Sequence, residues 1–432
     1  MNQAIQTIKS RTRFSYAWVV LGTTFLVLLA AAGIRATPSV LIVPLEHEFG
    51  WSVTTISFVI SFNIALFGLI GPFSAAAMQR YGVRPVVLSA LCLLAIGTSS
   101  SILMTQPWHM LLAWGVTVGV GSGVVSNTLS ATIVGRWFET RRGLAMGLLT
   151  ASTATGQMVF LPLMAYMADH IGWRAVALVG AAVATLALPL VAIFLPERPQ
   201  DIGLKPYGLQ EDAAADVASG AKNPLAIAFL ALRNATKIRD FWLLFFSFFV
   251  CGMSTNGYIG SHFITMCGDY GIVAVGGASI LAMMGMLDLV GTTASGWLSD
   301  RYDARVLLFW YYGLRGIALI FLPYAFGISY FGLPIFAVIY GLDWIATVPP
   351  TVRLANDVFG RLAAPIVFGW IGAGHQLGAA CATLLAGMLR NSLGSYTMSS
   401  VLMGVACIAT AVMVLRISGV RASSDLIVPA PT

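Results

Sequence analysis

Long apolar runs, separated by short polar stretches, dominate the pattern of this chain. A helix needs about 20 apolar residues to cross the hydrocarbon core of a membrane, and twelve runs reach roughly that length. They cover approximately residues 16–43, 53–77, 84–104, 109–134, 143–167, 174–195, 241–263, 273–297, 306–326, 331–352, 362–388 and 395–415. Glycine and proline are scattered within these runs, which membrane helices tolerate better than soluble helices do. The pattern predicts an all-α membrane protein with twelve transmembrane helices.

One long polar stretch, residues 196–240, divides six of these runs from the other six. It contains proline, glycine, alanine and charges of both signs, as linkers often do. We therefore predict an N-terminal six-helix bundle over residues 1–195, a cytoplasmic linker over 196–240, and a C-terminal six-helix bundle with a short cytoplasmic tail over 241–432. A surface helix is expected within the linker, near residues 224–236.

The composition agrees with a membrane protein and excludes a soluble one. Charged residues make up 9% and hydrophobic residues 58% of the 432 residues, and the mean hydropathy is +0.84. A soluble protein of this length needs far more charge to cover its surface.

The net charge of +7 follows membrane topology, not a nucleic-acid surface. With the N-terminus in the cytoplasm, 20 of the 24 Lys and Arg residues fall on the cytoplasmic side, and only Arg174 and Arg390 on the other. Arg35 and Arg315 lie inside predicted helices. Cytoplasmic loops carry such an excess of basic residues. We therefore expect both termini in the cytoplasm, a location in the plasma membrane (the inner membrane of a bacterium), and no nucleic-acid partner.

The two halves are related by an internal repeat. The pairs Arg80-Tyr81 and Arg301-Tyr302 lie 221 residues apart, and Phe138 and Phe359 keep the same spacing. A shift of one more residue aligns Gly147 with Gly369, Gly156 with Gly378, Asp169 with Asn391 and Gly172 with Gly394. Parallel six-helix repeats suit alternating access, in which two bundles rock about a site near the middle of the membrane.

A loop signature accompanies the repeat. Its second-half copy reads Gly296, Asp300, Arg301 and Arg305, whereas the first-half copy keeps Arg80, Gly82 and Arg84 but has Ala75 and Gln79 in place of glycine and aspartate. Through this signature the chain resembles the major facilitator superfamily over essentially its whole length. Three segments further resemble bacterial members of the monocarboxylate-transporter branch: RWFETRRGLAMG, RPQDIGLKPYG and GWIGAGHQLGAACATLLAG. The resemblance implies a secondary active transporter.

The signature residues are expected to form a gate at the cytoplasmic face. Gly296 would allow a close helix approach, and Asp300 would accept hydrogen bonds at the N-terminus of a neighbouring helix, where the dipole favours an anion. The alternative is that these residues only anchor the loops. The gating candidates are Gly296, Asp300, Arg301, Arg305, Arg80 and Arg84.

Five ionisable side chains fall inside predicted helices: Arg35, Asp288, Arg315, Asp343 and His375. A charge at mid-membrane costs roughly 2.5–3.5 kcal/mol on insertion scales, so each is a candidate functional group. In the monocarboxylate-transporter branch, an aspartate of the eighth helix is implicated in proton-coupled carboxylate binding and is followed four residues later by arginine. Alignment on Gly296 places Asp288 on that aspartate and Thr292 on the arginine. The resemblance thus implies that Asp288 carries the proton; a structural acid is the alternative.

Arg35 is the first candidate for the missing cation. It lies in the outer half of the first helix, near Ser39, where many members of the branch have a lysine after the proline corresponding to Pro38. A guanidinium binds a carboxylate through two parallel hydrogen bonds. The alternative is that Arg35 extends to the membrane interface.

The remaining polar residues are weaker candidates. Asp343 precedes Pro349 and Pro350, which could kink the tenth helix, and His375 could titrate near neutral pH. Arg315, on a peripheral helix, is expected to pair with an acid. Asn127 and Tyr258 could line a substrate cavity, although interhelical hydrogen bonding would also account for them.

No nucleophile–base motif, phosphate-binding glycine loop or metal-ligand spacing accompanies these residues. We therefore predict no enzymatic activity and no cofactor, and a monomer that moves a small organic anion, a monocarboxylate, together with protons. An exporter of larger amphipathic compounds and a solute sensor that does not transport remain alternatives.

Overall fold

A computed structural model describes residues 15–208, 224–327 and 332–418. Within these ranges the chain is helical, apart from turns and one isolated β-bridge between Phe138 and Tyr207. Ten stretches are long and apolar enough to cross a membrane: Tyr16–Phe49, Val53–Gly71, Val83–Leu103, Pro107–Trp137, Trp173–Phe194, Arg239–Asp269, Ala274–Ser299, Ala304–Ala325, Gly332–Gly360 and Thr397–Val414. Helix α9 (Arg142–His170) and the part of α17 (Val348–Leu393) after Gly360 complete twelve segments, so the predicted all-α architecture is confirmed.

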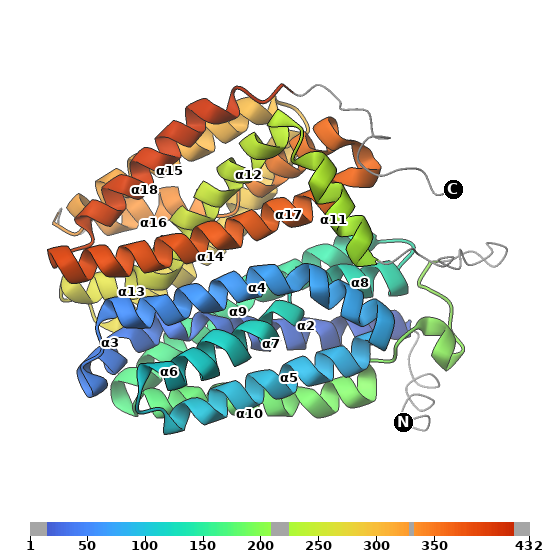
Figure 1. Cartoon of the computed structure of the whole chain (residues 1–432), viewed down its shortest axis with the longest axis horizontal. Helices are drawn as coiled ribbons and strands as arrows, with labels where there is room; N and C mark the ends of the chain where they lie inside the picture. The colour runs from blue at the N-terminus through green and yellow to red at the C-terminus, as the bar shows by residue number, and fades with distance from the viewer. Residues whose placement is uncertain (1–14, 209–223, 328–331, 419–432) are drawn as a thin grey trace.

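The helices form two groups, one above the other in Figure 1. The lower group contains α2 (Tyr16–Ala36), α3 (Pro38–Phe49), α4 (Val53–Tyr81), α5 (Val83–Ser100), η1 (Ser101–Leu103), α6 (Pro107–Met110), η2 (Leu111–Val118), α7 (Gly119–Val124), α8 (Asn127–Trp137), α9 and α10 (Trp173–Phe194). The upper group contains α12 (Arg239–Gly252), η4 (Met253–Ile259), α13 (Gly260–Asp269), α14 (Ala274–Ser299), α15 (Ala304–Ala325), α16 (Gly332–Asp343), α17 and α18 (Thr397–Val414). Between them in sequence lie η3 (Pro199–Ile202) and α11 (Pro224–Ala235), the latter where a linker helix is expected.

Local sequence explains where many of these helices begin and end. The hydroxyls of Ser15 and Ser52 accept hydrogen bonds from the first turns of α2 and α4, as N-cap residues do. Gly50 and Gly394 end α3 and α17 in the left-handed conformation that glycine adopts without steric cost. Gly360, also at positive φ, turns the chain between the tenth and eleventh segments, which α17 otherwise joins.

The two groups meet along three helix pairs: α4 with α17, α9 with α14 and, less extensively, α3 with α13. Small and hydroxylated residues line the first pair: Ser61 donates a hydrogen bond to the Ala380 carbonyl at 2.7 Å, and Thr54 to the Gly387 carbonyl at 3.2 Å. A methyl group on Gly387 would overlap Ser57 of α4, so glycine is needed for this approach.

An ion pair joins the two groups at the end away from the chain termini in Figure 1. There Arg390 forms ion pairs with Glu46 of the lower group at 3.1 Å and with Asp269 of its own group at 2.9 Å. One hydrophobic core includes the lower group and upper-group residues such as Phe263, whereas a second core around Phe241 is separate. The second core lies near the end that carries both termini in Figure 1.

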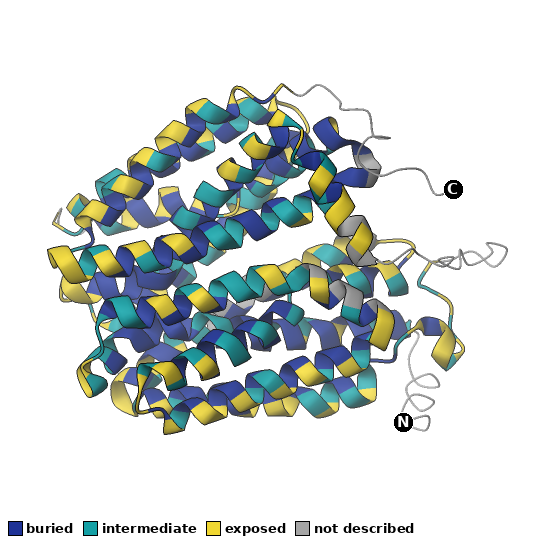
Figure 2. Ribbon diagram, in the orientation of Figure 1, coloured by how far each residue is buried: buried dark blue, intermediate teal, exposed yellow. Residues whose placement is uncertain are grey.

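Large apolar side chains remain exposed on the outer helices, including Ile96, Leu186, Trp310 and Val405. Figure 2 shows exposed positions distributed along the outward faces of α5, α10, α15 and α18. Many exposed apolar side chains on outward faces are unfavourable in water and favourable against lipid.

Candidate functional site

The tenth segment is broken in the middle. Helix α16 ends at Asp343, the turn Trp344–Thr347 follows, and α17 begins at Val348 with Pro349 and Pro350 in its first turn. Proline suits the first turn of a helix because the N–H it lacks would have no intrahelical partner. The break nevertheless leaves backbone groups without helical partners, and each unsatisfied group costs several kcal/mol within a membrane.

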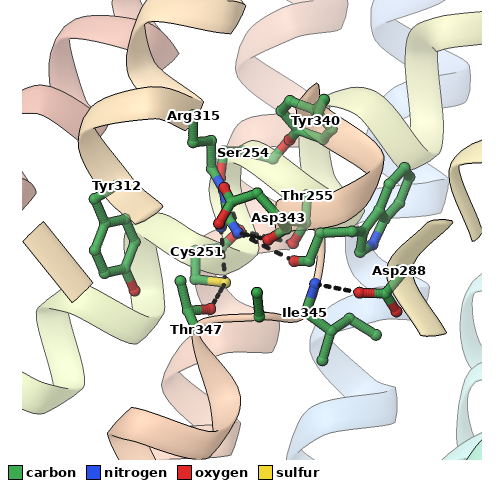
Figure 3. Close-up of polar contacts among 12 residues, drawn as sticks. Cys251, Ser254, Thr255, Asp288, Tyr312, Arg315, Tyr340, Asp343, Ile345 and Thr347 are labelled. Atoms are coloured by element: carbon green, nitrogen blue, oxygen red, sulfur yellow. Dashed lines mark hydrogen bonds and ion pairs between the residues drawn. The ribbon is translucent and has the colours of Figure 1, made fainter. Parts of the chain in front are cut away.

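Arg315 of α15 satisfies the carbonyl side of the break. Its guanidinium donates to the backbone carbonyl of Asp343 and, at 3.1 Å, to that of Trp344, and its Nε lies 2.7 Å from Asp343 Oδ2 (Figure 3). A further hydrogen bond of 3.1 Å reaches Cys251 Sγ. Arg315 is 0% exposed, so it acts as a buried cationic cap at the negative end of the α16 dipole. The expected pairing of Arg315 with an acid is confirmed.

Asp288 and Ser295 of α14 hold the other side of the break. Asp288 Oδ1 accepts hydrogen bonds from the Ile345 N–H and from the Thr292 hydroxyl, each at 2.8 Å. The Ser295 hydroxyl donates to the Ala346 carbonyl at 2.5 Å. Asp288 is only 4% exposed. The two acids predicted as site residues, Asp288 and Asp343, therefore meet at one turn of the backbone.

The cluster contains two carboxyl groups, those of Asp288 and Asp343, but only one guanidinium group, that of Arg315. Asp343 Oδ1 is buried and has no hydrogen-bond partner within the described ranges. Cys251 adds a thiol that lies 3.2 Å from the Thr347 hydroxyl. Among the residues the structure describes, no group of His, Cys, Asp and Glu could hold a metal ion.

Arg35 does not supply the cation for Asp288 in this structure. Its guanidinium lies over the Phe67 ring, 4.8 Å from the ring centre. It forms no ion pair with any acid in the described part of the chain. The cation near Asp288 is Arg315, for which only pairing with an acid was expected.

The other predicted site residues lie in three different environments. His375 packs against the Phe248 ring at 4.9 Å and lies beside the Cys251 thiol. The Tyr258 hydroxyl is fully buried and bonds the Ser400 hydroxyl at 2.5 Å and the Tyr396 carbonyl at 3.2 Å, which braces the upper group of helices internally. Asn127 is exposed and begins α8, at a break in the fourth segment.

The second-half loop signature shows mainly local contacts. A methyl group on Gly296 would meet nothing within 4 Å, so the expected close helix approach is absent in this conformation. Asp300 is exposed, and its side chain makes no hydrogen bond or ion pair within the described ranges, so its expected bond to a neighbouring helix is likewise not seen. Arg301 stacks on Trp297 of its own helix, with 4.1 Å between guanidinium carbon and ring centre.

Asp303, which occupies a glycine position of the signature, caps α15. It accepts from the Arg305 N–H at 2.9 Å and pairs with the Arg305 side chain at 2.6 Å. The hydrogen bonds from the Arg305 side chain hold the pKa of the Asp303 carboxyl below its usual range. Arg305 also donates to the Ile417 carbonyl at 3.2 Å, which ties this loop to the end of the last helix.

The first-half loop is held by Glu197, which was not among the predicted residues. Its carboxylate accepts from the N–H groups of Val83 at 2.6 Å and Arg84 at 2.9 Å, at the start of α5, and lies 3.7 Å from Arg136. Arg80 is exposed and stacks on Tyr81. The only sequence signal for Glu197 is an acid directly after the sixth apolar run. It supplies a carboxylate to the loop whose signature carries Gln79.

The comparison with known proteins agrees with this architecture. The profile of the Major Facilitator Superfamily matches residues 23–364, and the chain belongs to this family of membrane transporters. Monocarboxylate transporter 13 of Bos taurus is 26% identical over 398 residues, covering 91% of this chain and 87% of that protein. The uncharacterized MFS-type transporter YcxA of Bacillus subtilis (strain 168) is 25% identical, covering 81% of this chain and 82% of its own.

Solved structures show the same fold. A D-xylose-proton symporter superposes with a TM-score of 0.74 at 15% identity, covering 94% of this chain and all of the symporter. A bacterial homologue of the human lysosomal transporter Spinster, described as inward-facing and unoccupied, superposes with a TM-score of 0.67 at 17% identity over 94% of this chain.

Proposed function

We propose that this transporter moves a small monocarboxylate together with a proton. The observation that carries the proposal is the buried cluster of Asp288, Asp343 and Arg315, which has two carboxyl groups for one guanidinium. With both acids ionised, the cluster would hold an uncompensated negative charge, which costs several kcal/mol in an apolar interior. Binding of one proton removes that charge.

Asp288 is the acid better suited to bind the proton. Asp343 is paired directly with the guanidinium of Arg315, so its charge already has a counter-charge. The hydrogen-bond partners of Asp288 are the neutral Thr292 hydroxyl and Ile345 amide. The relatives named monocarboxylate transporters support a carboxylate as the co-transported solute.

Arg35 is the proposed binding group for the carboxylate. It is a partly buried cation in the lower group of helices, and no acid within the described ranges neutralises it. An anionic substrate would supply the missing counter-charge through bidentate hydrogen bonds. His375, Asn127 and Asp343 remain secondary candidates for contacts with the solute.

We further propose that the protein lies in a bacterial inner membrane with both termini in the cytoplasm. The termini are placed there because 20 of the 24 basic residues then fall on the cytoplasmic side. The end joined by Glu46 and Arg390 would then face outward. Each chain contributes both bundles and the whole interface between them, so a monomer suffices for transport.

The decisive experiment is uptake of labelled acetate, lactate and pyruvate into proteoliposomes under an imposed pH gradient. Accumulation that a protonophore abolishes supports the proposal.

The Asp288→Asn variant should lose accumulation but keep solute exchange. Arg35→Ala should raise the half-saturating solute concentration at least about tenfold, whereas Arg174→Ala, which removes an arginine paired with Glu48 at the protein surface, should not. Unaltered accumulation in Asp288→Asn would refute the proton role, and transport of bulky amphipathic compounds alone would identify an exporter.

A further inference from the structure

The Trp344–Thr347 turn is attached to two other helices through side chains. Its amide at Ile345 is bonded to Asp288, its carbonyl at Ala346 to Ser295, and its carbonyl at Trp344 to Arg315. Asp288 and Ser295 belong to α14, and Arg315 belongs to α15. The position of the turn therefore depends on contacts that protonation can alter, because one of the three is made by a carboxyl group.

Helices α14 and α16 lie close together beside this turn. A methyl group on Gly291 of α14 would overlap the carbonyl of Leu342, and one on Gly341 of α16 would approach Met284 within 2.9 Å. Helix α14 also packs against α9 of the other group of helices. The turn therefore lies against a helix that also forms part of the interface between the two groups.

A second break in the chain shows that the interruption does not itself require charge. In the fourth segment, α7 ends at Val124 and α8 begins at Asn127, which lies 221 residues before the first residue of α17. That break is capped locally: the Ser126 hydroxyl accepts from the Thr128 N–H at 3.4 Å. Of these two breaks, the structure shows buried charges among the described residues only at the one in the tenth segment.

The ionisable groups around Asp288 come from four elements. Arg315 lies on α15, Asp343 on α16 and Cys251 on α12, and His375 of α17 lies beside Cys251. Helix α9, which packs on α14 from the other group, has no acidic or basic residue between Arg142 and Asp169. The charge on Asp288 is thus set by this cluster and by its own proton.

We propose that Arg315 is a positioning residue for proton coupling: it holds the turn so that the Ile345 N–H reaches ionised Asp288, and protonation of Asp288 frees the turn to move. A hydrogen bond to a carboxylate is roughly twice as strong as one to a neutral acceptor. Loss of the charge therefore weakens the attachment of the turn to α14, while the bonds from Arg315 and Ser295 limit how far the turn moves. This inference rests on the proton role of Asp288 proposed above.

The test measures movement instead of transport. Spin labels at Leu289 of α14 and Ile339 of α16, both exposed, report the distance between these helices by pulsed electron paramagnetic resonance; Cys92 and Cys381, the exposed cysteines, are first replaced by serine. The distance distribution should change between pH 8 and pH 5 in the otherwise unaltered chain. In the Asp288→Asn variant, the distance distribution at both pH values should match the one that the unaltered chain shows at pH 5. A label pair at Leu69 and Leu112 in the lower group, where the break is neutral, should show no change.

Arg315→Lys tests the positioning role. Lysine keeps the positive charge but lacks the planar group that binds Asp343 and the two carbonyls, so the pH-dependent change should be lost or its midpoint displaced. Ser295→Ala provides a milder second variant, with a broader distribution expected at pH 8. A distance independent of pH in the unaltered chain, or an unchanged pH response in both Arg315→Lys and Ser295→Ala, overturns the inference. Failure of proton-driven uptake with an intact distance change would count against the proposed function alone.

Discussion

The interiors of the two bundles differ at equivalent positions of the repeat. At a spacing of 221 residues, Asp288, Arg315 and Asp343 correspond to Phe67, Leu94 and Ser122. Leu94 is fully buried, and the Ser122 hydroxyl bonds the Gly119 carbonyl of its own helix at 3.2 Å. The first copy therefore has an uncharged residue at each of these three positions, although a helix is broken in both copies.

This difference indicates that the fold does not depend on the charges of Asp288, Arg315 and Asp343. A buried ion pair or triad can often be replaced by well-packed apolar residues at no cost in stability, and the first bundle contains such a replacement. The charges in the second bundle are better explained by function. In the first bundle, the guanidinium of Arg35 lies over the ring of Phe67, which is the residue equivalent to Asp288. The first copy thus has a cation near the position at which the second copy has its acid cluster.

The largest expected effect comes from making one position of the second bundle resemble the first. Arg315→Leu removes the cation and leaves Asp343 and two carbonyls buried without it, which should destabilise the protein by about 3–5 kcal/mol. Thermal unfolding of the purified protein in detergent measures this loss. The double variant Arg315→Leu/Asp343→Asn, which removes both charges, should recover at least half of it. Equal instability of the single and double variants would mean that the bundle does require the ion pair.

A smaller effect is expected where one arginine serves both bundles. Glu46→Gln breaks the ion pair between bundles, and Asp269→Asn breaks the one within the second bundle. Because partly exposed pairs contribute up to about 1 kcal/mol, Glu46→Gln should shift the conformational equilibrium toward opening at this end by a factor of up to about five. Accessibility of a cysteine introduced at the interface measures the shift. An equal or larger shift in Asp269→Asn would show that Arg390 does not act across the interface.

The two loops of the repeat provide a comparison of similar size. Glu197→Gln weakens two charge-assisted hydrogen bonds at the start of α5 and should cost about 1 kcal/mol. Asp303→Asn keeps a good capping residue on α15 and should cost less than about 0.5 kcal/mol. Unfolding in denaturant distinguishes them. A greater loss in Asp303→Asn would show that the second-half loop depends on its ion pair with Arg305.

The smallest effect is a dependence on pH. Since the pKa of folded Asp303 lies below its usual value of about 4, its charge stabilises the folded state above that value. This contribution is lost as the pH falls from about 4 through the lower pKa of the folded protein. The difference in melting temperature between the unaltered chain and Asp303→Asn should therefore shrink over that interval. A difference that grows on acidification would mean that folding raises the pKa.

Much of the architecture was predictable because it depends on local and repetitive properties of the chain. Apolar runs of sufficient length specify membrane segments, since every backbone group within lipid must be paired inside a helix. The repeat follows from residue spacing alone, and Asp288 and Asp343 stand out because acids within apolar runs are costly.

Only the tertiary structure decided which of these groups meet. The sequence suggested Arg35 as the cation for Asp288, but Arg315, on a helix expected to be peripheral, bonds Asp343 and lies near Asp288. The sequence likewise could not show that Glu197 would cap α5, or that Asp288 would bond the backbone of the turn between α16 and α17. Such contacts depend on the rotation and depth of packed helices, which the spacing of apolar residues along one helix does not determine.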